Sequence, residues 1–199
     1  MQILYSDAGI VACVKPVGLD SESEVPAALK EQLSGEIFPI HRLDKNVGGV
    51  MVYARTKAAA AALSKAVQEG SMVKEYVALV HGTPPESGDW EDYLFKDSRK
   101  NKVFVVKKER KGVKLARLEF QRITTGEASL VRIRLHTGRS HQIRVQFSSR
   151  AFPLVGDHKY GSRDTATAPM LFSCRISLPW AGGIKIFEAL PDWAPKTAL

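Results

Sequence analysis

The alternation of apolar and polar residues predicts a chain built mainly of short strands. In residues 131–135, Val, Ile and Leu fall on one side of an extended backbone and two arginines on the other, which is typical of a half-buried strand. Apolar and β-branched runs bounded by turn-forming residues predict further strands. These runs cover residues 2–5, 10–14, 48–55, 73–80, 103–106, 115–124 and 170–178.

Three other segments have the spacing and the end signals of helices. Residues 26–33 begin with a proline in the first turn. Residues 57–68 follow Thr56 as an N-cap and stop before Gly70. Residues 140–149 carry apolar side chains four positions apart, which share one helix face.

The balance of these elements predicts the fold class. Residues 83–98 contain turn-forming residues and few apolar runs, so we expect a loop there. Strands outnumber helices, and most connections are short. We therefore predict an α+β (mixed α/β) fold, in which a largely antiparallel mixed sheet is flanked by helices and loops.

Length and composition narrow the class of protein. A chain of 199 residues with 44% hydrophobic and 25% charged residues favours one globular domain over residues 1–199. No apolar stretch approaches the ~20 residues of a membrane span, and the N-terminus lacks a secretory signal. Cys13 and Cys174 are far apart in sequence, which excludes a disulfide framework and a zinc ribbon. We expect a cytoplasmic monomer.

The net charge points to a polyanionic partner. Lys and Arg number 29 against 21 Asp and Glu, a difference of +8, which favours nucleic acid first and a membrane surface second. Residues 99–117 hold nine basic residues and one acid, and we predict that they form a hairpin that contacts nucleic acid. A well-solvated surface hairpin is the alternative. The basic residues are Arg99, Lys100, Lys102, Lys107, Lys108, Arg110, Lys111, Lys114 and Arg117.

Residues 38–44 contain a candidate catalytic carboxylate. If the chain is extended there, Arg42 and Asp44 share one face and Leu43 points into the core. The arginine favours the ionised form of the neighbouring carboxylate, and an ionised aspartate on a connecting loop is a candidate nucleophile or base. A surface Arg–Asp pair worth ~0–1 kcal/mol is the alternative.

Residues 135–145 concentrate groups that bind anions. Gly138 supplies a turn and Ser140 is a candidate helix N-cap. Arg139 and Ser140 at the start of a helix suit a phosphate. Arg144, one turn further along, is placed to reach a buried carboxylate. A capped helix with a polar face is the alternative.

The spacing of residues gives no support for metal or cofactor chemistry. His136 and His141 are five positions apart, which matches neither a helical metal pair nor a zinc finger. We find no Walker loop, dinucleotide fingerprint or nucleophile elbow. His41 and His81 are interpreted as hydrogen-bonding scaffold residues. We therefore predict no metal and no cofactor.

Four blocks of sequence occur in the order found in one enzyme family. Residues 11–19 (VACVKPVGL) are similar to its NKPxGL element, and residues 41–44 (HRLD) match its HRLD motif. Residues 74–82 (KEYVALVHG) resemble the strand that carries its active-site tyrosine. Residues 137–145 (TGRSHQIRV) resemble its TGRxHQIRVH block, and LVGDHKYG follows at residues 154–161. Over about residues 10–191, the chain resembles the RluA-like RNA pseudouridine synthases.

The resemblance implies a pseudouridine-synthase-like fold and an isomerase that converts uridine to pseudouridine in structured rRNA or tRNA, without a cofactor. By the family pattern, Asp44 is the catalytic residue, Arg144 pairs with it, and Tyr76 packs on the target uracil. Arg42 occupies the space that the flipped base vacates. RNA contacts are expected from Arg42, Arg139, Ser140 and His141, and from Lys100, Lys102, Lys107, Lys108, Arg110 and Lys111 of the basic segment.

The chain departs from the family pattern at two places. Val47-Gly48-Gly49 stands where the family usually has Thr-Ser-Gly, and Gln146 stands where it commonly has His. Both departures bear on loop shape or RNA contacts. No extension resembling the S4 RNA-binding domain precedes the first block, so the RNA affinity is expected to come from the catalytic domain.

Other functions stay open from the residues. A non-catalytic RNA-binding protein would use the same basic surface and would tolerate the loss of Asp44. A phosphodiesterase or nuclease would use His41, Asp44, His136 and His141, and the spacing of these residues counts against it. A membrane-surface role is disfavoured because the charge lies in a strand-like segment rather than in a basic amphipathic helix.

Overall fold

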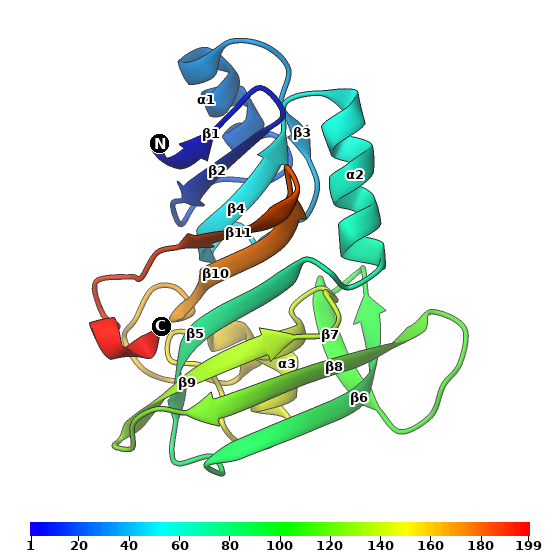
Figure 1. The fold of residues 1–199 in the computed structure, drawn as a ribbon. Coiled ribbons are helices and arrows are strands. Elements are labelled where there is room, and N and C mark those ends of the chain that lie inside the picture. The colour runs from blue at the N-terminus through cyan, green and yellow to red at the C-terminus, as the bar shows by residue number, and fades with distance from the viewer. The chain divides into compact units, whose positions relative to one another are not determined.

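The computed structural model describes residues 1–199, which form two compact units (Figure 1). Unit 1 consists of Met1–Glu75, Phe172–Thr197 and Leu199, and unit 2 of Tyr76–Leu171 and Ala198. Eleven strands and three α-helices confirm the predicted mixed α/β class. The prediction of one catalytic domain over residues 1–199 stays a prediction. None of the helices is long and apolar enough to cross a lipid bilayer.

Unit 1 is built on a mixed sheet. Its elements are β1 (Gln2–Ser6), β2 (Ile10–Lys15), α1 (Glu24–Leu33), β3 (Phe38–Pro39), β4 (Gly48–Ala54), α2 (Lys57–Gln68), β10 (Leu171–Trp180), β11 (Gly183–Glu188) and the 3-10 turn Lys196–Ala198. The strand order is β1-β2-β4-β10, with β3 beside β4 and β11 beside β10. All these pairs are antiparallel except β4 with β10, which is parallel.

The core of unit 1 lies between the sheet and α2. All seven residues of β4 are buried, as expected of a central strand covered on both faces. The α2 helix has the predicted bounds, and the Thr56 side chain accepts a hydrogen bond from the Ala59 N–H at 3.1 Å. Leu63 and Ala66 continue the buried face of α2, at helical spacing from Ala59. The N-cap hydrogen bond of Thr56 contributes about 1 kcal/mol to the free energy of unfolding.

Unit 2 contains five strands and one helix, although the first three residues of β5 belong to unit 1. Its elements are β5 (Val73–His81), β6 (Ser87–Asp97), β7 (Lys102–Val106), β8 (Val113–Arg122), β9 (Ala128–Leu135), α3 (Gln142–Ser148) and the 3-10 turn His158–Tyr160. The strand order is β5-β9-β8-β6-β7, and β6 is antiparallel to both β7 and β8. As Figure 1 shows, α3 lies against one face of these strands.

An aromatic cluster joins α3 to the sheet of unit 2. The ring of Phe147 lies 4.7 Å from that of Trp90 on β6 and 5.2 Å from that of Phe120 on β8, between centroids. Gly88 on β6 faces Phe120, and a Cβ there would lie 2.3 Å from the ring. The close packing of these rings therefore requires glycine at position 88.

The prediction of a loop over residues 83–98 is wrong, because β6 is an eleven-residue strand. Acidic side chains and Gly88 lower its intrinsic β-propensity. Pairing on both edges, with Ser87–Phe95 against β8 and Tyr93–Asp97 against β7, overrides that propensity. The same pairing places β6 between β7 and β8. The basic segment 99–117 therefore contains β7 and the first residues of β8, which pair with opposite edges of β6 and not with each other, so the segment is not a two-stranded hairpin.

Candidate functional site

The loop that carries Asp44 connects β3 to β4 in unit 1 and is tied at several points. The Ser21 hydroxyl donates to the Leu43 carbonyl at 3.0 Å and accepts from the Leu43 N–H at 3.2 Å. The Gly18 N–H donates to the Lys45 carbonyl at 2.8 Å, and the Val47 N–H to the Asp44 carbonyl at 2.9 Å. The loop therefore has a defined conformation, with the Asp44 side chain partly exposed and Leu43 buried, as predicted for Leu43.

Lys15 holds this loop from inside the core. Its ammonium is fully buried and donates to the carbonyls of Pro16 at 2.9 Å, Leu19 at 2.8 Å and Lys45 at 3.2 Å. Burial lowers the pKa of Lys15 to about 8, and the carboxylates of Asp20, Asp44 and Glu24 oppose that shift. At neutral pH the group is therefore still mainly charged.

Sequence reasoning missed the structural role of Lys15. The only signal was the family-like lysine and proline pair at residues 15–16, which precedes a turn. The structure shows that this block and the HRLD block form one hydrogen-bonded assembly, because Lys15 and Gly18 both bind the Lys45 carbonyl.

His41 is a scaffold residue, as predicted. Its Nε2 accepts a hydrogen bond from the N–H of Val52 on β4 at 3.1 Å, so Nε2 carries no proton. Its Nδ1 is enclosed without a hydrogen-bond partner. Burial, and secondarily the positive charge of Lys74, lower the pKa of His41 to about 3.

Arg42 forms an ion pair with Glu22 and not with Asp44, the partner considered from the sequence. Arg42 Nη1 lies 2.9 Å from Glu22 Oε2, and 58% and 51% of the two side chains are exposed. Alternation along one extended strand relates Arg42 only to its sequence neighbours, whereas the bend after Ile40 brings residues before α1 within reach of Arg42.

Arg144 is buried in unit 2, with its guanidinium bound to a buried carboxylate. Its Nε lies 2.7 Å from Asp157 Oδ2 and its Nη2 2.8 Å from Asp157 Oδ1, a bidentate pair in which the two side chains are 4% and 1% exposed. The guanidinium carbon is also 5.1 Å from the centroid of the Tyr160 ring. The carboxylate that Arg144 reaches within unit 2 is thus Asp157, a partner that sequence reasoning did not identify.

The turn before α3 is held by side chains rather than by the predicted Ser140 cap. The helix begins after His141, whose φ is 50°, and has no side-chain cap. Instead, Gln142 Oε1 accepts the hydroxyl of Thr137 at 2.8 Å and the N–H of Arg139 at 3.0 Å. His141 Nδ1 lies 2.8 Å from the Tyr160 hydroxyl. Ser140, which is partly exposed, does not cap the helix.

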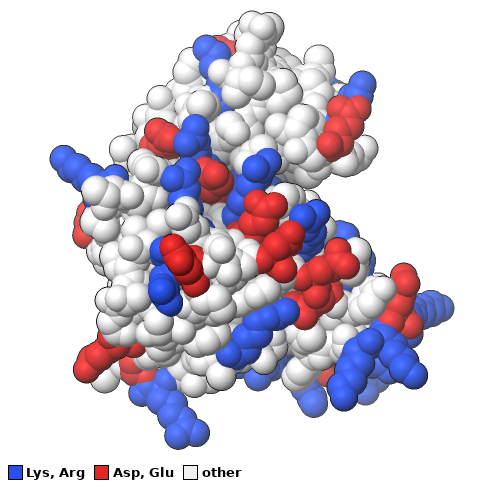
Figure 2. All heavy atoms as spheres, turned by 60° about the horizontal axis from the view of Figure 1, so that its bottom comes forward, with Lys and Arg blue, Asp and Glu red and all other residues white.

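The remaining predicted residues differ in exposure. Tyr76 on β5 is 5% exposed. Lys102 is partly buried, with its ammonium 5.3 Å from the Tyr160 ring centroid. The exposed residues of the basic segment include Lys100, Lys107, Lys108, Arg110 and Lys111. Figure 2 shows Asp and Glu side chains interspersed among Lys and Arg on the face that it draws. Lys and Arg therefore share this face with acids.

The histidines considered for metal-assisted hydrolysis have other partners. His41 binds a backbone N–H, His136 Nε2 lies 2.7 Å from Glu119, and His141 contacts Tyr160. No group of three or more His, Cys, Asp and Glu side chains is arranged to hold a metal ion. These contacts favour structural roles for the three histidines.

Known proteins resemble this chain in sequence and in fold. The sequence model of the RNA pseudouridylate synthase family matches residues 9–149. The tRNA pseudouridine synthase C of Haemophilus ducreyi is 33% identical over 181 residues, which cover 81% of this chain and 74% of that protein. The ribosomal large subunit pseudouridine synthase D of Zymomonas mobilis is 30% identical over 190 residues, which cover 87% of this chain and 60% of that protein.

The solved structure of human RNA pseudouridylate synthase domain containing 4 matches with a TM-score of 0.82 at 24% identity. The match covers 96% of this chain and 89% of that chain, which confirms the predicted fold. The four sequence blocks, the matched residues 9–149 and the similarity to the two bacterial relatives agree. The chain therefore belongs to the RNA pseudouridylate synthase family, whose members are isomerases that convert uridine in RNA to pseudouridine.

Proposed function

We propose that this protein isomerises specific uridines in structured tRNA or rRNA, with Asp44 as the catalytic carboxylate. The observation that supports this role is the way the Asp44 loop is held. Lys15, Gly18 and Ser21 fix its backbone from one side, while the Asp44 side chain stays partly accessible. A carboxylate in a fixed and accessible position is what an attacking or charge-stabilising group requires.

The proposed chemistry suits a single carboxylate. The N1–C1′ bond of uridine breaks, the uracil turns, and C5 forms a new bond to C1′ while the proton on C5 leaves. N1 takes up a proton as the C5 proton is lost, so the composition of the nucleoside does not change and no electrons are transferred. The sugar becomes electron-poor at C1′, as in glycoside cleavage, where a carboxylate stabilises or traps the developing cation. Asp44 supplies that carboxylate.

Tyr76 and Arg144 complete the proposed catalytic set. Tyr76 packs on the target uracil and assists removal of the C5 proton. Arg144 stabilises the ionised form of Asp44, in the role that the family pattern gives it. A guanidinium has five N–H donors in a rigid plane, so it can serve a second carboxylate in addition to Asp157.

The target uridine must leave its stack to reach the carboxylate, which costs a few kcal/mol. We propose that Arg42 fills the vacated space, because a planar guanidinium stacks well on neighbouring bases. The exposed ion pair of Arg42 with Glu22 contributes only ~0–1 kcal/mol, so Arg42 can exchange Glu22 for RNA at little cost.

A second group of residues is proposed to bind RNA. Their contacts with phosphates offset the free-energy cost of moving the target uridine out of its stack. Two bacterial relatives are named for tRNA and for the ribosomal large subunit respectively, which makes tRNA and rRNA the substrate classes to test. The proposed RNA-binding residues are Arg42, Arg139, Ser140, His141, Lys100, Lys102, Lys107, Lys108, Arg110 and Lys111.

Tritium release from RNA labelled at uracil C5 tests this proposal. Unmodified tRNA and rRNA transcripts are incubated separately with the wild-type protein and with Asp44→Asn, and RNA binding is measured for both proteins. We expect release by the wild type from one RNA class and none by a folded Asp44→Asn variant that still binds RNA. Absence of release from both classes, with RNA binding intact, would support the non-catalytic RNA-binding protein instead.

A further inference from the structure

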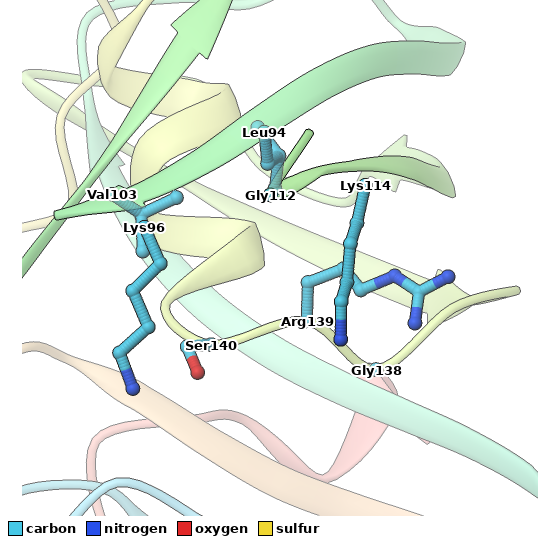
Figure 3. Close-up of a pocket in the computed structure, with 8 residues that line it drawn as sticks. All are labelled: Leu94, Lys96, Val103, Gly112, Lys114, Gly138, Arg139 and Ser140. Atoms are coloured by element: carbon cyan, nitrogen blue, oxygen red, sulfur yellow. The ribbon is translucent and has the colours of Figure 1, made fainter. Parts of the chain in front are cut away.

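A small pocket in unit 2 combines three positively charged side chains with a hydroxyl (Figure 3). Its volume is about 220 Å³. Lys96 comes from β6, Lys114 from β8, and Arg139 and Ser140 from the turn before α3. Leu94 and Val103 contribute apolar wall. The side chains thus come from segments that are far apart in the sequence.

The strand register explains why the two lysines meet. Leu94 on β6 pairs directly with Lys114 on β8, and Lys96 is two residues along β6 from Leu94. Residues two apart on a strand share a face, so Lys96 and Lys114 are diagonal neighbours on one face of the sheet, about 7–8 Å apart at the backbone. Figure 3 shows both side chains extending from their strands toward the 138–140 turn.

Arg139 is anchored at the edge of the same pocket. Its Nε donates to the Leu115 carbonyl on β8 at 2.9 Å, next to Lys114, and its backbone N–H donates to Gln142 Oε1 at 3.0 Å. These bonds hold the backbone and the Nε of Arg139, and they leave the two terminal nitrogens of the guanidinium as further donors. The arginine is therefore positioned before any ligand arrives.

The charge of this pocket is not neutralised by protein. No acid lines it, and neither Lys96 nor Lys114 forms an ion pair. Other basic side chains of unit 2 do have carboxylate partners, such as Arg117 with Asp89 at 2.6 Å and Arg150 with Asp92 at 2.8 Å. Grouped like charges repel one another, so an anion that enters the pocket is stabilised by all three cations.

We propose that this pocket binds one backbone phosphate of the RNA substrate. This inference rests on the proposed function, and it adds Lys96 and Lys114 to the RNA-binding set. Small-molecule pockets usually measure about 300–1,000 Å³, so this one is too small for a whole nucleotide ligand and suits a phosphate group. Two ammonium groups, a guanidinium and a hydroxyl are donors to phosphate oxygens. A phosphate held beside the 138–140 turn fixes the register of the RNA without reading its sequence.

Phosphate ethylation interference tests the proposal, because an ethylated phosphate has lost its negative charge. The probe is an end-labelled tRNA transcript, or an rRNA transcript if tritium is released only from rRNA. The pocket variant is Lys96→Gln with Lys114→Gln. The matched control is Lys57→Gln with Lys65→Gln, which removes two exposed lysines of α2 that neither line the pocket nor belong to the proposed RNA-binding set.

We expect at least one phosphate whose ethylation excludes RNA from the wild-type complex and from the control complex, but no longer from the complex with the pocket variant. The pocket variant should also bind RNA about tenfold more weakly at moderate salt, with a log–log salt slope reduced by about 0.7–0.9. An interference pattern in the pocket variant identical to that of the wild type would overturn the proposal.

Tritium release measured on the same preparations keeps the two claims separate. An unchanged interference pattern together with tritium release by the wild type overturns the phosphate pocket and leaves the isomerase standing. A phosphate that loses its interference only in the pocket variant, without tritium release by the wild type, supports the pocket and overturns the isomerase.

Discussion

The Asp44 loop of unit 1 and the Arg144 helix of unit 2 are held in opposite ways. The loop is fixed through its backbone, by donors from Lys15, Gly18 and Ser21, and the Asp44 side chain stays partly exposed. Arg144 is fixed through its side chain, by two bonds to the buried Asp157. In the Asp44 loop, hydrogen bonds hold the main chain. At Arg144, hydrogen bonds hold the charged side chain itself.

This difference separates what each region contributes to stability from what it contributes to reactivity. A buried charge depends strongly on its partner, since losing that partner leaves the charge in a poorly solvating interior. A partly exposed carboxylate depends less on its neighbours for stability. Substitutions around Arg144 should therefore unfold the protein, whereas substitutions at Asp44 should remove activity from a folded protein.

The largest expected effect on stability is that of Asp157→Ala. Removal of the bidentate partner of the buried Arg144 should lower the free energy of unfolding by about 3–5 kcal/mol, measured by urea denaturation. Asp89→Ala is the matched control, because Asp89 forms the same bidentate pair with Arg117 but at the surface. There the expected loss is ~0–1 kcal/mol. Equal losses for the two variants would contradict the distinction between the buried and exposed pairs.

A second prediction concerns the support of the Asp44 loop. Lys15→Met should lower the free energy of unfolding by about 1–3 kcal/mol, because three partly buried carbonyls lose their common donor. The displaced loop should also slow tritium release by about 10- to 100-fold. The exposed Lys30, which pairs with Glu36, supplies the control Lys30→Met, with little effect on either measurement. Wild-type rates in a folded Lys15→Met protein would show that Lys15 does not position the loop.

The third prediction is a pH dependence carried by His41. The pKa of His41 is lowered to about 3 in the folded protein, so between that pH and its ordinary value of about 6.5 the unfolded chain binds the additional proton. Stability conferred by neutral His41 is therefore present above pH 6.5 and declines as the pH falls. Compared with His41→Gln, the wild type should lose about 2 kcal/mol between pH 6.5 and 5. Parallel stability curves for the two proteins would refute this assignment.

The smallest expected effect is that of Glu22→Gln, which releases Arg42 from its surface ion pair. The free energy of unfolding should change by less than about 1 kcal/mol. RNA affinity should rise by up to a few fold, because Arg42 no longer has to give up the Glu22 carboxylate before it contacts RNA. A fall in affinity after this substitution would argue against the proposed contact between Arg42 and RNA.

The elements that the sequence predicted well are those with local signals. The bounds of α2 follow from the Thr56 cap, the apolar spacing and Gly70, all within fifteen residues. The burial of Leu43 followed from simple alternation. By contrast, β6 forms because β7 and β8 pair with both of its edges, which no pattern inside residues 87–97 records.

The contacts of the candidate site residues could also not be predicted from neighbouring positions in the sequence. The Arg42–Glu22, Arg144–Asp157 and Lys15–Lys45 contacts join residues 20, 13 and 30 positions apart. Family resemblance supplied the candidate residues, but it did not supply the side chains that hold them. Those contacts depend on where the turns before α1, α3 and β4 bring the backbone, which is a property of the tertiary fold.

The catalytic role of Asp44 is tested most directly by the single-turnover yield of pseudouridine. After reaction with the RNA class that releases tritium, the RNA is digested and pseudouridine is quantified by mass spectrometry for wild type, Asp44→Asn and a control. The control is Asp192→Asn, which changes an exposed aspartate outside the proposed catalytic and RNA-binding sets. We predict a rate about 1,000-fold or more below wild type for Asp44→Asn, with a similar melting temperature and similar RNA affinity, and a wild-type rate for Asp192→Asn. Pseudouridine formation by folded Asp44→Asn at a rate close to that of wild type would contradict Asp44 as the catalytic carboxylate.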